Sequence, residues 1–196
     1  MPINQMKAFR MSADVQKNLE MKLAIHCATL IKKERFACIV TLWEEECAIL
    51  SRLLKGTGIL YRFLAKKGDT VLVYLYRKNL LCKHLHNHKI HTFLQSYGYS
   101  EGNLAHMISE LANRMKAFYK GEMGFPHETG AFLGYPLEDV EGFLNDVDGT
   151  RCQYVGYWKV YENVEQKKVL FGSYDQLRED AVLAVLEGKS IREIAV

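Results

Sequence analysis

The sequence lacks the features that mark membrane, secreted and repeat proteins. No apolar run reaches the ~18 residues that a membrane span requires, and residues 1–7 lack the apolar core of a secretory signal. These two absences predict a cytoplasmic protein that does not insert into a membrane. Only three prolines occur, and there is no low-complexity linker or internal repeat. One domain spanning residues 1–196 is therefore expected.

Cysteine is too irregularly spaced to suggest a covalent or zinc-bound framework. The chain has five cysteines, an odd number, and no CxxC pair. This pattern argues against a disulfide scaffold and against a zinc finger or ribbon. Buried thiols in the core are the simplest interpretation, and a hydrophobic content of 48% is enough to build such a core.

The common motifs of catalysis and nucleotide binding are also missing. The sequence contains no Gly-rich phosphate loop, no HExxH and no GxSxG. Their absence removes the commonest signatures of nucleotide-binding proteins, zinc proteases and hydrolases. It leaves open whether the protein is an enzyme.

Charge is nearly balanced overall but unevenly distributed. The formal net charge is +3, yet residues 1–100 carry 16 Lys/Arg against 7 Asp/Glu, and residues 101–196 carry 10 against 16. Two halves that pack together would offset each other, whereas a basic surface for an anionic ligand is the alternative. The basic residues are scattered and not interleaved with aromatic residues, which favours the first explanation.

Hydrophobic periodicity predicts an α+β fold. Helices are expected over residues 13–34, 43–55, 78–97 with a break near Asn87, 101–119, 126–146 in two pieces, and 163–196 as a C-terminal helical extension. Strands are expected over residues 36–42, 59–65, 70–77 and 152–161, the middle two forming a hairpin. Both faces of residues 70–77 are apolar, so this strand should be central. Together these elements predict a mixed sheet of about four strands that is covered by helices.

Residues 125–144 are the most informative segment, because they contain Pro126-His127-Glu128 and Leu133-Gly134-Tyr135-Pro136. Local structure explains the prolines as helix starts and Gly134 as a helix stop. It does not require the side chains of His127, Glu128 or Tyr135. An imidazole near a carboxylate and a phenol is suited to general-base or metal-binding chemistry. A purely structural role for these three side chains is nevertheless the preferred interpretation.

The Pro-His-Glu and Leu-Gly-Tyr-Pro motifs resemble those of the bacterial domain-of-unknown-function family DUF3793. The similarity extends to His26-Cys27-Ala28, where Thr29 replaces the proline typical of the family, and over most of the chain. The resemblance implies no established activity. It implies a link to iron or redox metabolism.

The leading functional hypothesis is a cytoplasmic accessory protein with a small-ligand or metal pocket around these two motifs. His127, Glu128 and Tyr135 are the candidate catalytic residues, and His26 and Arg77 are candidate lining residues. A structural or protein-interaction role without catalysis is the alternative, and the oligomeric state stays open.

Cys27 offers a further catalytic hypothesis. It follows His26 directly and would act as a nucleophile, with His127 as a distant base. Adjacent helix residues point in different directions, so a buried Cys27 that packs against the sheet is the simpler expectation.

A histidine-rich stretch suggests a separate metal site. If residues 80–97 formed one helix, His84, His88 and His91 would lie on one stripe. Imidazoles placed in this way hold zinc, nickel, copper or iron, so a divalent metal is a candidate cofactor. A break at Asn87 would separate His84 from His88, and a polar His-rich helix face is the other interpretation.

Two segments resemble helix–turn–helix motifs and raise a DNA-binding alternative. In the first, the would-be recognition helix, residues 137–148, has five acidic residues and no Lys or Arg, so phosphates would repel it. The second, residues 186–195, leaves no room for a recognition helix. Nucleic-acid binding is therefore not expected, and a small molecule or a metal is the expected partner.

Overall fold

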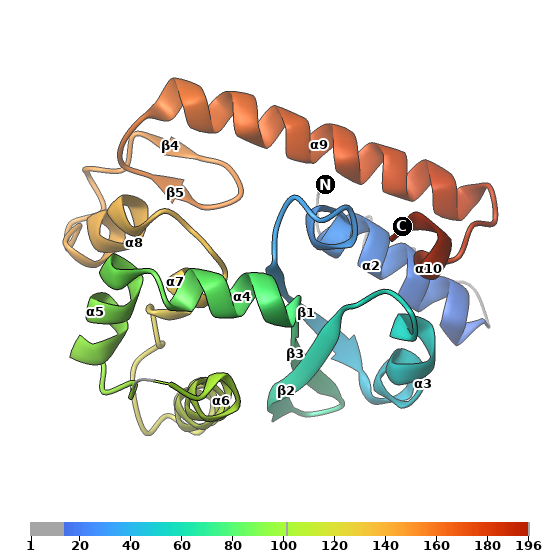
Figure 1. Ribbon diagram of the computed structural model, residues 1–196, viewed down its shortest axis with the longest axis horizontal. Helices are drawn as coiled ribbons and strands as arrows, with labels where there is room; N and C mark the ends of the chain where they lie inside the picture. Colours follow the sequence, from blue (N-terminus) through green and yellow to red (C-terminus); the bar gives the residue numbers. More distant parts are fainter. Residues whose placement is uncertain (1–13, 101, 196) are drawn as a thin grey trace.

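A three-stranded antiparallel sheet forms the centre of the computed structural model, which describes residues 14–100 and 102–195 (Figure 1). The strands are β1 (Ala37–Trp43), β2 (Leu60–Lys67) and β3 (Thr70–Tyr76), in the order β1-β3-β2. The predicted hairpin is β2–β3, and its turn contains Gly68 with a φ of 56°, in the left-handed region that glycine tolerates.

β3 is the central strand, as its two apolar faces predicted. Val73 and Leu75 belong to the core on one side of the sheet, and Tyr74 belongs to the core on the other side. All three side chains have no exposed surface. Helices therefore cover both faces of the sheet.

One face is covered by α2 (Val15–Ile31), α3 (Glu44–Leu54), α9 (Val164–Leu186) and α10 (Ile191–Ile194). Asp14 caps α2 by accepting from the backbone N–H groups of Gln16 and Lys17. Figure 1 shows α9 running along α2. Residues 163–196, considered above as a helical extension, thus supply Ala181, Ile191 and Ile194 to this core.

The other face is covered by α4 (Lys78–Leu85), α5 (His88–Ser96), α6 (Leu104–Tyr119) and α7 (Thr129–Phe132). The predicted break between α4 and α5 is confirmed. Asn87 stands at the break, and its side-chain oxygen accepts from the Lys89 N–H at 3.1 Å. An asparagine that caps the next helix favours a new helix start over continuation of the first.

A small third cluster contains α8 (Leu137–Leu144) and the short strands β4 (Tyr154–Val155) and β5 (Lys159–Val160). The buried Asp139 joins them, because its carboxylate accepts from Trp158 Nε1 at 2.7 Å and from the Tyr161 N–H at 2.8 Å. A Cβ on Gly156 would lie 2.3 Å from the Phe171 ring. The bare glycine lets the β4–β5 turn pack onto α9.

The α+β class and the single helix-covered domain are confirmed, but the sheet differs from the expectation in detail. The predicted mixed sheet of about four strands has three strands, and both of its strand pairs are antiparallel. Residues 152–161 do not supply a fourth strand. The chain reverses between β4 and β5, so this segment pairs with itself and packs around Trp158 and Phe171.

Neither described stretch, residues 14–100 or residues 102–195, contains a helix that is both long enough and apolar enough to cross a membrane.

Candidate functional site

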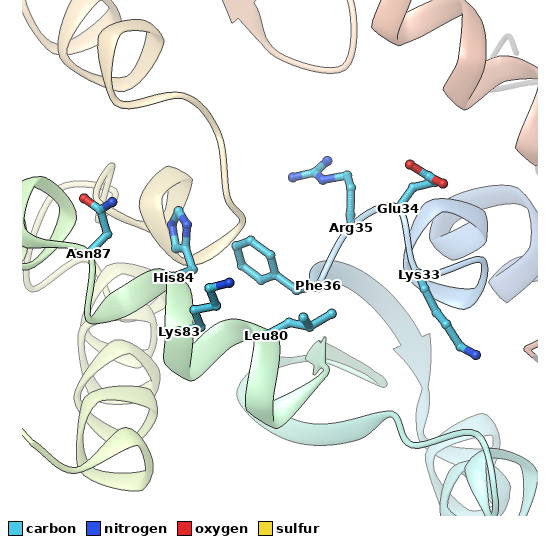
Figure 2. A pocket seen from close by; sticks show the side chains of 8 residues that line it. All are labelled: Lys33, Glu34, Arg35, Phe36, Leu80, Lys83, His84 and Asn87. Atoms are coloured by element: carbon cyan, nitrogen blue, oxygen red, sulfur yellow. The ribbon is translucent and has the colours of Figure 1, made fainter.

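A groove of about 390 Å³ lies between the loop that follows α2 and helix α4 (Figure 2). We call it the basic groove. Its lining residues are Lys33, Glu34, Arg35, Phe36, Leu80, Lys83, His84 and Asn87. The first four come from the loop between α2 and β1, and the last four come from α4 and the break after it.

The Phe36 ring forms the apolar part of the groove together with Leu80. Figure 2 shows this ring directed toward His84, and the two ring centroids are 4.6 Å apart. On another side the ring meets Gly134, where a Cβ would lie 2.4 Å from it. Gly134 has a φ of +74°, so two separate constraints favour glycine at this position. The Leu-Gly-Tyr-Pro motif thereby fixes the position of Phe36.

The same motif orients Arg35. The Arg35 Nη2 donates to the backbone oxygen of Leu133. Its guanidinium carbon lies 5.0 Å from the Tyr135 ring centroid and 5.6 Å from that of Trp158. The two rings stack at 4.9 Å. Contacts of this kind hold a guanidinium in place without neutralising its charge.

His84 closes one end of the groove as a neutral side chain. Its Nε2 lies 2.9 Å from the Ala131 backbone oxygen, and since a carbonyl only accepts, Nε2 carries the proton. Burial lowers the pKa of the imidazole, while the Ala131 hydrogen bond raises it by less. Near neutral pH the groove therefore receives no charge from His84.

The groove carries more positive than negative charge, and its cations are not in ion pairs within the described part of the chain. Among the described residues, Lys33, Arg35 and Lys83 have no carboxylate within ion-pair distance. The stretch from α4 through α5 contains no Asp or Glu at all. Figure 2 shows the side chains of Lys33 and Glu34 pointing away from Phe36. The other two lining cations are Lys83, which reaches toward the Phe36 ring in that view, and Arg35, which lies over Tyr135 and Trp158.

The predicted His127–Glu128 pair does not form one site. Glu128 has no exposed surface, whereas His127 is exposed and lies between the rings of Phe125 and Phe143, with centroids at 5.2 and 4.9 Å. Neighbouring residues at a helix start point about 100° apart. The hypothesis that both side chains open into a shared pocket is therefore corrected.

Glu128 instead anchors α7 in the core. Its Oε1 accepts from Arg114 Nε at 2.6 Å and from the Tyr99 hydroxyl at 3.1 Å. Burial and the adjacent Glu128 raise the pKa of Tyr99. The second oxygen, Oε2, has no hydrogen-bond partner within the described stretches. This carboxylate joins α6, α7 and the turn after α5.

Tyr135 borders the basic groove through Arg35, but His26, Cys27 and Arg77 lie elsewhere. His26 is exposed on α2. Arg77 donates to the backbone oxygens of Leu30, Ile31 and Thr57. The Arg77 guanidinium therefore caps the C-terminus of α2 and does not face the groove.

Cys27 is unsuited to the predicted nucleophile role. It is 1% exposed, and a hydrogen bond with Cys38 followed by burial raises the pKa of its thiol well above the usual value. The thiolate is the reactive form of cysteine, so these surroundings disfavour attack. The expected packing of Cys27 against the sheet is what the structure contains.

The three histidines proposed as metal ligands do not line one stripe. His84 belongs to α4, whereas His88 and His91 belong to α5 beyond the break. His84 is bonded to Ala131, and His88 is exposed. Within residues 14–100 and 102–195, no three His, Cys, Asp or Glu side chains gather closely enough to hold a metal. The metal hypothesis required residues 80–97 to form one helix, and they do not.

Sequence reasoning missed Arg35, Phe36 and Lys83, although a signal was available. No acidic residue occurs between Asp69 and Glu101, and Lys32-Lys33-Glu34-Arg35 is a local run of three cations and one acid. These segments are about 50 residues apart in the chain, and only the fold brings them to the two sides of one groove.

The architecture and the site define a helix-covered α+β domain with a basic groove beside a Leu-Gly-Tyr-Pro segment. The family model described as "Protein of unknown function (DUF3793)" matches residues 23–195. The chain belongs to this family, which confirms the resemblance. A search of curated proteins and a search of solved structures each gave no match.

Proposed function

We propose that the protein is a bacterial cytoplasmic accessory protein that binds a small anionic ligand in the basic groove. The observation that carries the proposal is the pair of cations, Arg35 and Lys83, placed without carboxylate partners beside the fixed Phe36 ring. A cavity of about 390 Å³ is within the range of small-ligand sites.

The electrostatics support an anion. Two cations that share a concave surface attract an anion more strongly than scattered surface charges do, because the low-dielectric walls focus the field. A guanidinium presents several donors in a plane that matches the oxygens of a phosphate or carboxylate. Each charge-assisted hydrogen bond contributes roughly 1.5–3 kcal/mol, and less at an open rim.

Isothermal titration calorimetry with inorganic phosphate tests this proposal. We expect saturable binding that weakens as salt rises, because salt screens exposed charges. Lys83→Gln should weaken binding about tenfold, the loss of one charge-assisted contact. Lys78→Gln is the matched control, since Lys78 is exposed on the same helix and does not line the groove.

Two results would contradict the proposal. One is the absence of saturable heat with phosphate at low salt, and the other is an equal loss of affinity in Lys83→Gln and Lys78→Gln. The predicted divalent metal and the link to iron or redox metabolism stay separate predictions. Metal analysis of protein purified without a histidine tag, followed by titration with Fe(II) and Zn(II), tests them.

A protein-interaction role is the second candidate, and one observation favours it. Phe118, Phe125, His127 and Phe143 form a continuous row of ring contacts. We call it the aromatic row. Phe125 is 42% exposed and Phe143 is 37% exposed, and exposed aromatic side chains are typical of interfaces. Phe125→Ser should abolish any self-association measured by analytical ultracentrifugation; a concentration-independent monomer argues against a homomeric interface.

A further inference from the structure

We infer that the ligand of the basic groove is a phosphate monoester with a flat, apolar body. The inference rests on the proposed function and narrows the class of anion. It depends on two features of the groove, which are its charge and the apolar surface beside the charge.

The charge of the groove matches a dianion. The lining contains three cations and one carboxylate, so its formal charge is 3 − 1 = +2 with His84 neutral. Figure 2 shows Lys33 and Glu34 both directed away from Phe36 and Lys83 reaching toward the Phe36 ring. The other lining cation is Arg35, whose guanidinium lies over the rings of Tyr135 and Trp158. A phosphate monoester carries about −1.5 to −2 at pH 7, whereas a carboxylate carries a single charge and would leave one cation unpaired.

The apolar part of the groove is fixed in position and partly open. Phe36 is held between His84 and Gly134. Leu80, on the facing helix, is 44% exposed. Neither inorganic phosphate nor a sugar phosphate would cover these two side chains. A flat ring or a similar apolar group would remove them from water and would contact the Phe36 ring.

The arrangement is preorganised, which favours binding of a small ligand. The loop that carries Arg35 and Phe36 is tied to residues 133–135 by the Arg35–Leu133 hydrogen bond and by the Phe36–Gly134 contact. Side chains that are already held lose little freedom on binding. The ring and the cations can therefore act together on one ligand.

A comparison of phenyl phosphate, inorganic phosphate and benzoate by calorimetry tests the inference. Phenyl phosphate should bind about tenfold more tightly than inorganic phosphate, the effect of one aromatic contact. It should also bind more tightly than benzoate, because benzoate satisfies only one cation. Leu80→Asn should bring the affinity for phenyl phosphate close to that for inorganic phosphate while leaving the latter unchanged.

Leu80 is chosen because it is exposed, so Leu80→Asn should keep the fold intact; thermal unfolding checks this. Phe36→Leu is the second variant, and it should also reduce the difference in affinity between phenyl phosphate and inorganic phosphate. Equal affinity for phenyl phosphate and inorganic phosphate would overturn the inference and leave the anion-binding proposal standing, as would tighter binding of benzoate. If none of the three probes binds, both the inference and the proposed function are refuted.

Discussion

The two most informative motifs of the sequence are separated by only four residues, yet they have different surroundings. Pro126-His127-Glu128 places a carboxylate in the core, where Arg114 and Tyr99 hold it. Leu133-Gly134-Tyr135-Pro136 lies behind the lining of the basic groove, where it positions Arg35 and Phe36. The first motif stabilises the fold, and the second positions two residues that line the basic groove. Two motifs in one segment therefore need not share one site.

The largest expected effect comes from removing the buried carboxylate. Glu128→Ala should lower the free energy of unfolding by about 3 kcal/mol, because it leaves the Arg114 guanidinium without its partner. Chemical denaturation measures the change. Glu122→Ala, at an exposed ion pair with Lys120, is the control and should cost less than about 1 kcal/mol. A similar loss in both variants would mean that burial does not distinguish them.

The next largest effect is expected at Gly134, which packs against Phe36. Gly134→Ala should destabilise the protein by about 1–3 kcal/mol, because the left-handed backbone and the Phe36 ring both oppose a Cβ. It should also weaken the binding of phenyl phosphate, because it displaces the Phe36 ring that the phenyl group would contact. Gly124→Ala is the matched control, since nothing lies within 4 Å of its added Cβ. Unchanged binding in Gly134→Ala would show that ligand binding in the groove does not depend on the Leu-Gly-Tyr-Pro motif.

A smaller effect, of opposite sign, is expected at Lys33. This residue follows the end of α2 with a φ of 67°, a conformation that favours glycine. Lys33→Gly should raise the free energy of unfolding by about 1 kcal/mol. Its side chain points away from Phe36, so phosphate affinity should change little. Lys32→Gly, at an ordinary φ of −81°, should instead destabilise. If Lys33→Gly lowers stability, the left-handed backbone conformation of Lys33 does not destabilise the protein.

The smallest effect is a dependence of stability on pH. The pKa of His84 is lowered in the folded state, so the unfolded chain binds the extra proton first as the pH falls. This contribution to stability is complete above the unfolded pKa, about 6.5, and is lost as the pH falls toward the lower folded pKa. His84→Gln, whose amide nitrogen corresponds to Nε2 and can still donate to Ala131, should show a weaker loss. Chemical denaturation at several pH values measures this dependence. The same pH profile of stability in the variant and the original protein would contradict the assignment to His84.

Much of the fold could be predicted because its signals are local. The doubly apolar pattern of residues 70–77 identified the central strand, and Asn87 identified the break between α4 and α5. The β4–β5 hairpin could not be predicted, because its reversal depends on Gly156 packing against Phe171 in a later helix. Short strands that pair only with each other leave a weak pattern in the sequence.

The site was less predictable because its contacts join distant segments. Tyr135 was singled out, but its partner Arg35 is about 100 residues away. Glu128 was chosen as a reactive group, yet its partners Arg114 and Tyr99 make it structural. Which of two adjacent residues faces the core depends on the rotation of a short helix, and four residues of α7 are too few to reveal it from periodicity.

The hydrogen bond from Arg35 to Leu133 spans 98 positions of the chain. Arg35 takes this position in the groove only after the early loop and the later motif have met, so no short fragment can contain the same arrangement. An anion held by Arg35 and Lys83 would link this loop to α4 and would raise the melting temperature of the whole domain by mass action. The ligand would in this way report on the correct assembly of the tertiary structure.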